Sequence, residues 1–394
     1  MMLSHIFTHD IEPGMLFNIP DHPVNVMLDI TNDCNNRCIY CYNPDSSINH
    51  GRSSDPKILK KIVSILGLSG TKEILYLGGE PFSSPSFMEI LEVGRKYNIF
   101  QRTVSNGSFL IDKNVCGVFK EKGLDEVGIS FHSSDEAVHD RITNRKGSFQ
   151  EAVLSLQNCI LAGISSFIQY SPNRFNSSRD ILKLAEYIKI LFGDEVKCFD
   201  INRLLPIGRG QKAQSVFLEN DEWFEFLVQS SNLRRYGFDV HAELTPFCWI
   251  NHKAKENNIP DHTLNEVYKM NRGCYMWVAQ LALDYNGRIK FCPAGPAVGP
   301  SIIDVKWPSF WKTGEEFKRY RSFSWNGKCV DFDKKNACAF FYRCLGGCKY
   351  SKGTPYQIDH YTIGPQNNLN EGYKNGKISK DKQSYNSEGV AWCR

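Results

Sequence analysis

The residues Cys34-Asn35-Asn36-Arg37-Cys38-Ile39-Tyr40-Cys41 are the most informative stretch of this chain. They place three cysteines in a C-x3-C-x2-C arrangement directly after an apolar run, residues 24–30, that predicts a strand. Iron–sulfur clusters are held by cysteine thiolates, and a cubane with three protein ligands keeps one iron open for another ligand. A structural zinc site needs four closed ligands, so zinc is the weaker interpretation of this loop. The spacing favours a catalytic cluster.

The composition is that of a soluble globular protein, with 41% hydrophobic and 12% aromatic residues. A length of 394 residues exceeds the size at which single cores stop growing, which predicts one large and one smaller domain. The net charge of +4 gives no reason to expect a nucleic-acid or membrane partner. Neither a membrane span nor a signal peptide is recognisable, so we predict a cytoplasmic protein. Its 14 cysteines then indicate metal or redox chemistry rather than disulfides.

Residues 24–210 alternate short apolar runs with amphipathic ones, which is typical of strand–helix units around a parallel sheet. The six units predicted fall short of the eight in a closed barrel. We expect strands at residues 24–30, 73–77, 100–105, 126–131, 166–171 and 195–201, and helices at 56–66, 85–97, 112–122, 149–162 and 178–191.

The rest of the chain divides into three further regions. Residues 1–23 form an N-terminal extension that is too short for a separate domain. Residues 211–273 are predicted as a connector with one helix, at 219–233, and residues 274–394 are rich in cysteine. The cysteines after the barrel region are Cys248, Cys274, Cys292, Cys329, Cys338, Cys344, Cys348 and Cys393.

Candidate ligand-binding residues follow the predicted strands. Gly78-Gly79-Glu80-Pro81 comes after the second strand, Ser105-Asn106-Gly107 ends the third, and Ser130 lies at the end of the fourth. Paired glycines permit positive φ and a close approach of backbone to a ligand, although such a pair alone also fits a simple turn. In parallel α/β folds the chemistry sits at the carboxyl ends of the strands, where all these residues lie.

The cysteine loop, with aromatic Tyr40 before its third cysteine, and the Gly78–Pro81 segment resemble the radical S-adenosylmethionine (radical SAM) enzymes. The resemblance implies an α/β fold, a partial (β/α)6 TIM-like barrel. It also implies a [4Fe-4S] cluster held by Cys34, Cys38 and Cys41, whose free iron binds the amino and carboxylate groups of S-adenosylmethionine. One electron then cleaves the sulfonium and yields a 5′-deoxyadenosyl radical.

The resemblance also assigns roles at the strand ends. Gly78, Gly79, Glu80 and Pro81 form the loop that binds the methionine amino group. Ser105 and Asn106 help to hold the cofactor, Ser130 lies near the ribose, Tyr40 belongs to the same site, and residues 205–210 close over adenine. Arg141, in a stretch similar to the family's "HD-x-I" region, pairs with the methionine carboxylate, which suits a planar guanidinium. The alternative interpretation is that Arg141 is a solvated arginine at the start of a helix and binds no ligand.

The C-terminal cysteines resemble the SPASM extension, whose seven-cysteine pattern holds two auxiliary [4Fe-4S] clusters. Two spacings depart from it: eight residues separate Cys329 from Cys338, and the gap from Cys274 to Cys292 is slightly long. Cys248 is a candidate fourth ligand of the first cluster, and an open site or a zinc site are the alternatives. The resemblance assigns Cys274, Cys292 and Cys348 to the first cluster, and Cys329, Cys338, Cys344 and Cys393 to the second.

The resemblance to the SPASM extension implies a peptide or protein as the substrate, as in most members of that family. We therefore predict a maturase that cross-links a ribosomally made precursor peptide, by analogy through a carbon–carbon bond of the cyclophane type. Its expected partners are that peptide and an external electron donor such as flavodoxin or ferredoxin. Cys198, on the sixth strand, is the one candidate for a catalytic hydrogen donor, although a core role is favoured.

Three other functions remain open. A sulfatase-activating maturase is disfavoured because Pro293 stands where that group has an aspartate base, directly after Cys292. A dehydrogenase or epimerase of a small molecule is the second. The third is a non-catalytic iron–sulfur or zinc module for electron transfer, which Gly78–Pro81 and Arg141 argue against because such a carrier needs no cofactor cradle.

Overall fold

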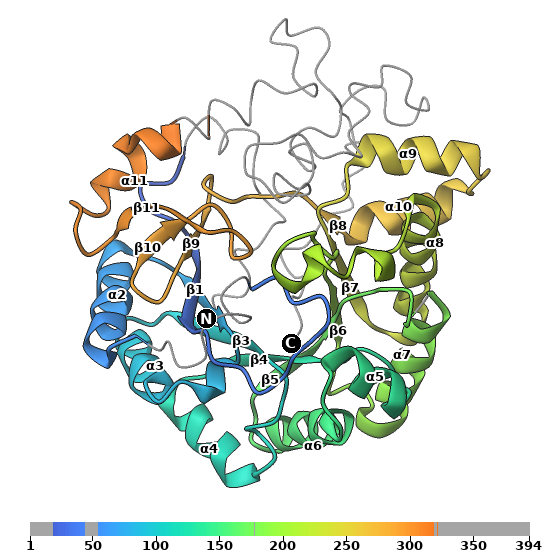
Figure 1. Ribbon diagram of the computed structural model, residues 1–394, viewed down its shortest axis with the longest axis horizontal. Helices are drawn as coiled ribbons and strands as arrows, with labels where there is room; N and C mark the ends of the chain where they lie inside the picture. Colours follow the sequence, from blue (N-terminus) through green and yellow to red (C-terminus); the bar gives the residue numbers. More distant parts are fainter. Residues whose placement is uncertain (1–18, 44–53, 177, 319–320, 322–394) are drawn as a thin grey trace, which may run out of the picture.

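The computed structural model describes residues 19–43, 54–176, 178–318 and 321. Within these residues the strands form one sheet in the order β11-β10-β9-β1-β2-β3-β4-β5-β6-β7-β8. Neighbours from β9 through β1 to β8 pair in parallel, while β10 pairs antiparallel with β9 and β11. The sheet curves into a partial barrel that is open rather than closed, with helices along its outer side (Figure 1).

The strands are short, as expected for parallel strand–helix units. They are β1 (Asn25–Thr31), β2 (Glu73–Gly78), β3 (Phe100–Ser105), β4 (Glu126–Ser130), β5 (Ser165–Tyr170), β6 (Cys198–Ile201), β7 (Asp239–Glu243), β8 (Asn271–Arg272), β9 (Gln280–Leu283), β10 (Arg288–Lys290) and β11 (Ala297–Ser301). Because β1 to β6 are parallel, their carboxyl ends lie at one edge of the sheet.

The helices pack an apolar face against the sheet. They are α2 (Pro56–Ser69), α3 (Phe87–Lys96), α4 (Lys113–Lys122), α5 (Glu136–Thr143), α6 (Ser148–Leu161), α7 (Ser178–Phe192), α8 (Asn220–Ser230), α9 (Phe247–Glu256), α10 (Asp261–Met270) and α11 (Ser309–Thr313). In α2, for example, the Asp55 side chain caps the first turn and Leu59, Ile62, Val63 and Leu66 form one buried stripe. None of the described helices has the length and hydropathy to cross a membrane.

The α/β partial barrel predicted from the sequence is confirmed, and the six predicted strands and five predicted helices all occur with small shifts at their ends. In the stretch at 211–273, predicted as a connector, the helix predicted at 219–233 occurs as α8. The structure adds α9, α10 and two further parallel strands, β7 and β8, which were not predicted. Strand β7 escaped prediction because its sequence, DVHAE, contains no apolar run. Residues 322–394, which hold five of the cysteines of the predicted SPASM extension, lie outside the described residues.

A buried group of charges lies at the amino-terminal ends of β2, β3 and β4, the edge opposite the cysteine loop. Arg102 lies 2.8 Å from Glu126 and 3.5 Å from Glu73, counted from guanidinium nitrogen to carboxylate oxygen. Its guanidinium also lies over the Phe167 ring, 4.9 Å from the centroid. Burial raises the pKa of Glu73 to about 8, so that this carboxyl is the protonated member of the group.

Candidate functional site

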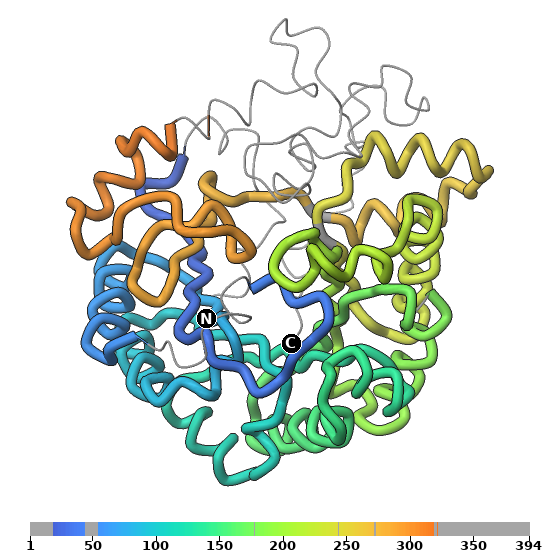
Figure 2. The backbone as a smooth tube through the Cα atoms, viewed as in Figure 1, coloured from blue at the N-terminus to red at the C-terminus, as the bar shows by residue number. Residues whose placement is uncertain are grey.

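The cysteine loop follows β1 at the carboxyl edge of the sheet, and Figure 2 shows it crossing in front of the strands. Cys34, Cys38 and Cys41 are half-buried there. Burial raises the pKa of Cys34 to about 12, and the nearby charge of Glu80 is the second cause. Burial also raises the pKa of Cys38, and the neighbouring Cys41 and Cys34 raise it further. The loop thus brings the three thiols close enough to act on one another.

The backbone of the loop is held by the end of α5. The Arg37 amide donates to the Thr143 carbonyl and the Ile39 amide to the Ile142 carbonyl, both at 3.0 Å. Within the loop the Cys41 amide donates to the Cys38 carbonyl at 3.3 Å. These bonds fix a loop that the sequence shows only as a spacing of cysteines.

The donor set fits an iron–sulfur cluster. Thiols that burial and mutual repulsion keep protonated are stabilised as thiolates by a bound metal centre, which supplies the missing positive charge. In the described part of the chain no three His, Cys, Asp or Glu side chains lie as close together as the ligands of one metal ion. In a cubane each thiolate binds a separate iron, so its cysteines need not converge on one point.

The Gly78-Gly79 pair packs against the start of the cysteine loop. A Cβ at Gly78 would lie 2.0 Å from the Thr31 carbonyl oxygen, and one at Gly79 would lie 2.1 Å from that of Asp33. The Gly79 amide donates to the Thr31 carbonyl at 2.7 Å. The two glycines are therefore required by contact between two backbone segments of the protein, a reason that the ligand-based prediction did not foresee. The predicted role in cofactor binding stays a prediction.

Glu80 connects the ends of β2 and β3. Its buried carboxylate accepts from Ser105 Oγ and from the Asn106 amide, each at 2.8 Å, and from the Phe82 amide at 3.3 Å. Burial raises the pKa of Glu80 to about 7, while these hydrogen bonds act in the opposite direction. Pro81 begins the short 3-10 helix η2 (Pro81–Ser83). The two segments predicted to bind the cofactor, Gly78–Pro81 and Ser105–Asn106, are thus joined by one side chain.

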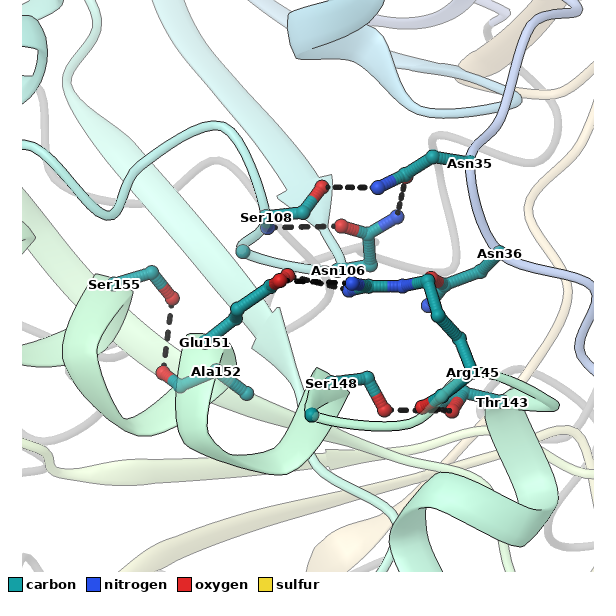
Figure 3. A network of polar contacts seen from close by, with 12 residues as sticks. Asn35, Asn36, Asn106, Ser108, Thr143, Arg145, Ser148, Glu151, Ala152 and Ser155 are labelled. Carbon is teal, nitrogen blue, oxygen red and sulfur yellow. Dashed lines mark hydrogen bonds and ion pairs between the residues drawn. The ribbon is translucent and has the colours of Figure 1, made fainter.

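Asn106 carries this network to the cysteine loop (Figure 3). Its Nδ2 donates to Asn35 Oδ1 at 2.8 Å and lies 3.9 Å from Cys34 Sγ. Its Oδ1 accepts from the Ser108 amide at 3.0 Å, and Asn35 Nδ2 donates to Ser108 Oγ at 2.8 Å. The Ser108 bond fixes the amide so that its NH2 group faces Cys34 and Asn35.

An arginine that the sequence reasoning missed, Arg145, contacts the same loop. Its Nε donates to Asn36 Oδ1, and its two terminal nitrogens pair with both Glu151 oxygens, at 2.8 and 2.5 Å (Figure 3). Arg141, the predicted ligand of the methionine carboxylate, is exposed, with its guanidinium 3.9 Å from the centroid of the Phe175 ring. Helix α5 ends between the two arginines, so helical periodicity could not tell which one faces the loop.

Tyr40 is buried and points away from solvent toward the end of β4. Its hydroxyl lies 2.8 Å from His132 Nδ1. Burial lowers the pKa of His132, and the nearby His139 lowers it further, so the ring is neutral. The His132 carbonyl in turn accepts from Asn176 Nδ2 at 2.7 Å. A tyrosine of the predicted cofactor site thus fastens the cysteine loop to the barrel.

Two other predicted residues lie in the sheet. Ser130 is the last residue of β4, half-buried at the carboxyl edge. Cys198 is fully buried on β6 beside Phe167, with its Sγ 3.6 Å from His241 Nδ1. The proposed hydrogen-donor role of Cys198 stays a prediction.

The described part of the C-terminal region contains three of the predicted cluster ligands. Cys248 is buried in α9, whereas Cys274 and Cys292 are half-buried. The loop carrying Cys292 is tied to β1, because Lys290 Nζ donates to Asp29 Oδ2 at 2.5 Å and to the Pro293 carbonyl at 2.6 Å. The remaining predicted ligands, Cys329, Cys338, Cys344, Cys348 and Cys393, lie outside the described residues.

Comparison with known proteins identifies the domain that carries this site. Residues 28–195 match the family model of the Radical SAM superfamily. The Fe-coproporphyrin III synthase of Methanosarcina barkeri (strain Fusaro / DSM 804) is 26% identical over 283 residues, which are 68% of this chain and 66% of that protein. The PqqA peptide cyclase of Gluconobacter oxydans (strain 621H) is 25% identical over 343 residues, 84% of this chain and 87% of that one.

A solved structure has a similar fold. Streptococcus suis SuiB, bound to the precursor peptide SuiA, is similar with a TM-score of 0.67 and 16% sequence identity, over 87% of this chain and 76% of that one. The family match contains the cysteine loop, Gly78–Pro81 and the ends of β3 and β4. Residues 28–195 are therefore a radical SAM domain, and a protein that carries this domain is an enzyme.

Proposed function

We propose that this enzyme is a peptide maturase that forms an intramolecular carbon–carbon cross-link in a ribosomally made precursor peptide. The observation that carries the proposal is the similarity to a PqqA peptide cyclase, which extends over 84% of this chain and 87% of that relative. The fold shared with SuiB, a protein solved with a precursor peptide bound, is consistent with it.

The chemistry needs the cofactors of the family. Radical SAM enzymes hold a [4Fe-4S] cluster and S-adenosylmethionine, which together supply a 5′-deoxyadenosyl radical able to abstract a hydrogen atom. The proposal assigns the cluster to Cys34, Cys38 and Cys41. Closing a cross-link removes two hydrogens from the peptide, one as the abstracted atom and one as a proton and an electron.

The chain's own residues organise the site around that loop. Glu80 keeps the ends of β2 and β3 together, and Asn106 aligns the loop from the side of Cys34. Two arginines, Arg141 and Arg145, are candidates for binding the methionine carboxylate. The contact with Asn36 in the cysteine loop favours Arg145 over Arg141.

The other parts of the proposal concern the C-terminal half and the partners. Two auxiliary [4Fe-4S] clusters, a flavodoxin or ferredoxin as electron donor, and a cytoplasmic location complete it. The tie between Lys290 and Asp29 supports an auxiliary site near the barrel, because it anchors the loop of Cys292 to the strand that leads into the cysteine loop.

A second candidate function is the modification of a tetrapyrrole. It is favoured by the similarity to an Fe-coproporphyrin III synthase, which covers 68% of this chain. The two functions share the radical chemistry and differ in the substrate pocket, so substrate tests separate them.

The first experiment tests the radical chemistry itself. Reconstituted protein, incubated anaerobically with S-adenosylmethionine and dithionite, should produce 5′-deoxyadenosine, measured by liquid chromatography and mass spectrometry. The C34A/C38A/C41A variant should produce none. R145Q should lose at least about tenfold more product than R141Q, because Arg145 contacts the cysteine loop through Asn36 whereas Arg141 is exposed. Formation of 5′-deoxyadenosine by the triple variant would refute the assignment of the cluster to these three cysteines.

The second experiment identifies the substrate. Short peptides encoded beside the gene are co-expressed with it, and iron coproporphyrin is supplied in a parallel reaction. A peptide that loses two hydrogens per modification supports cross-linking. Deuterium gain from heavy water without that loss would indicate epimerisation, and turnover of the porphyrin alone would favour the second candidate.

A further inference from the structure

The segment that follows β6 lies against the cysteine loop, as the meeting of the blue and yellow-green segments in Figure 2 shows. Gly208 has φ 56°, and a Cβ there would lie 2.5 Å from the Cys41 carbonyl oxygen. The next amide, that of Arg209, donates to the same carbonyl at 3.0 Å. The two backbones are in contact at a point where only glycine fits.

The Arg209 side chain adds a second contact to the loop. Its Nε donates to the Cys38 carbonyl at 2.8 Å, across 171 residues of sequence. The guanidinium is half-buried and acts electrostatically on both Cys34 and Cys38. One side chain therefore combines a hydrogen bond to the loop with a positive charge that acts on two of its thiols.

The other charges around these sulfurs are compensated differently. Arg145 also interacts with Cys34, but both of its terminal nitrogens are paired with Glu151. Glu80 contributes a carboxyl group near Cys34. Arg209 forms no ion pair with a carboxylate among the residues that the structure describes, so its charge acts on the loop with least compensation.

We propose that Arg209 is a positioning residue that holds the cysteine loop through the Cys38 carbonyl and raises the reduction potential of the cluster there. Reduction adds one electron to the cluster, and a nearby positive charge favours the more negative state. The inference rests on the assignment of the cluster to Cys34, Cys38 and Cys41.

The test compares R209Q and R209K in the full-length chain, reconstituted with iron and sulfide under anaerobic conditions. Glutamine can still donate to a carbonyl but carries no charge, whereas lysine keeps the charge. An EPR-monitored redox titration follows the signal that is lost in C34A/C38A/C41A, which separates this cluster from any other. In R209Q the equilibrium constant for reduction of the cluster should fall about tenfold, which corresponds to a potential about 59 mV lower for one electron. In R209K this constant should stay within about twofold of the wild-type value.

The matched control is R174Q, since Arg174 is an exposed arginine whose charge is balanced by Glu219 and Glu222. It should leave the potential unchanged. Full iron content with the wild-type potential in R209Q would overturn the proposal. If R209Q holds no cluster, R209K decides: the wild-type potential supports the proposal, and a tenfold fall in its reduction equilibrium refutes it. A wild-type protein without the cysteine-dependent signal would refute the cluster itself, and this inference with it.

Discussion

At the scale of single residues, Gly78 shows how closely the site is built. Its φ of 135° lies in a region that side-chain-bearing residues rarely adopt, and its missing Cβ makes room for the Thr31 carbonyl. The close approach lets the next amide, of Gly79, donate to that same carbonyl at 2.7 Å. The end of β2 and the residues that lead into the cysteine loop are therefore in direct backbone contact.

We expect G78A to destabilise the protein by at least about 2 kcal/mol, because alanine is strained at this φ and its Cβ overlaps the Thr31 oxygen. Formation of 5′-deoxyadenosine should fall with it, since the cysteine loop has to move. The measurements are the denaturant midpoint and the product yield. Gly117 in α4 supplies the control: a Cβ there meets no atom within 4 Å, so G117A should gain about 0.5–1 kcal/mol and keep full activity. Equal behaviour of the two variants would contradict the packing argument.

At the scale of elements, β2, β3 and β4 are joined at their amino-terminal ends by a buried arginine between two carboxyl groups. Two buried carboxylates cannot both be balanced by one guanidinium. Glu126 is the nearer partner of Arg102, and the pKa of Glu73 is raised to about 8 by burial, so Glu73 holds the proton. Stability should therefore depend on pH through Glu73.

The sign of the dependence follows from the two states. The ordinary pKa of Glu73 is 4.5, and its raised value in the folded protein is about 8, so its contribution to stability is full below pH 4.5 and is lost as pH rises through 8. The E73Q variant carries no such proton, so its free energy of unfolding relative to wild type should improve by up to about 1.4 kcal/mol per pH unit between pH 6 and 8.

Urea unfolding of both proteins at several pH values between 6 and 9 measures this difference. The comparison variant is E126Q, which leaves the buried Arg102 without its nearer partner and should cost about 3–5 kcal/mol at pH 7. A flat difference for E73Q over this range, with a loss as large as that of E126Q, would show that the proton is not on Glu73.

At the scale of the whole molecule, a buried ion pair joins the hairpin of β9 and β10 to the barrel, in addition to the pairing of β9 with β1. Lys290 in β10 and Asp29 in β1 are 261 residues apart in sequence. Strand β9 lies between them, pairing in parallel with β1 and antiparallel with β10. Since Lys290 also donates to the Pro293 carbonyl, the pair connects the loop of Cys292 to the strand that leads into the cysteine loop.

The K290M variant should lose about 3–5 kcal/mol of stability, because it leaves Asp29 as a buried carboxylate without its cation. Its iron content should fall by the share of an auxiliary cluster if Cys292 is a ligand. The double variant D29N/K290M should recover part of the stability, since the uncompensated charge is gone. Full iron content in K290M, with wild-type stability, would show that the pair has no such role.

The sequence by itself determined the cysteine spacing, the alternation of strands and helices from β1 to β6, and the Gly78-Gly79 turn. These are local patterns, whose period or spacing is set by the geometry of a strand, a helix or a turn. From them followed the partial barrel, which the structure confirms, and the radical SAM domain, which the family match confirms.

The tertiary structure alone decided which side chains meet across long stretches of sequence. It placed Arg145 rather than Arg141 on the cysteine loop, put Arg209 on the Cys38 carbonyl, and paired Lys290 with Asp29. No local pattern encodes such pairs, because each depends on how the sheet is ordered and where each strand ends. Only the tertiary structure explains why the turn needs glycines, because neighbouring carbonyl groups leave no room for a side chain at Gly78 and Gly79.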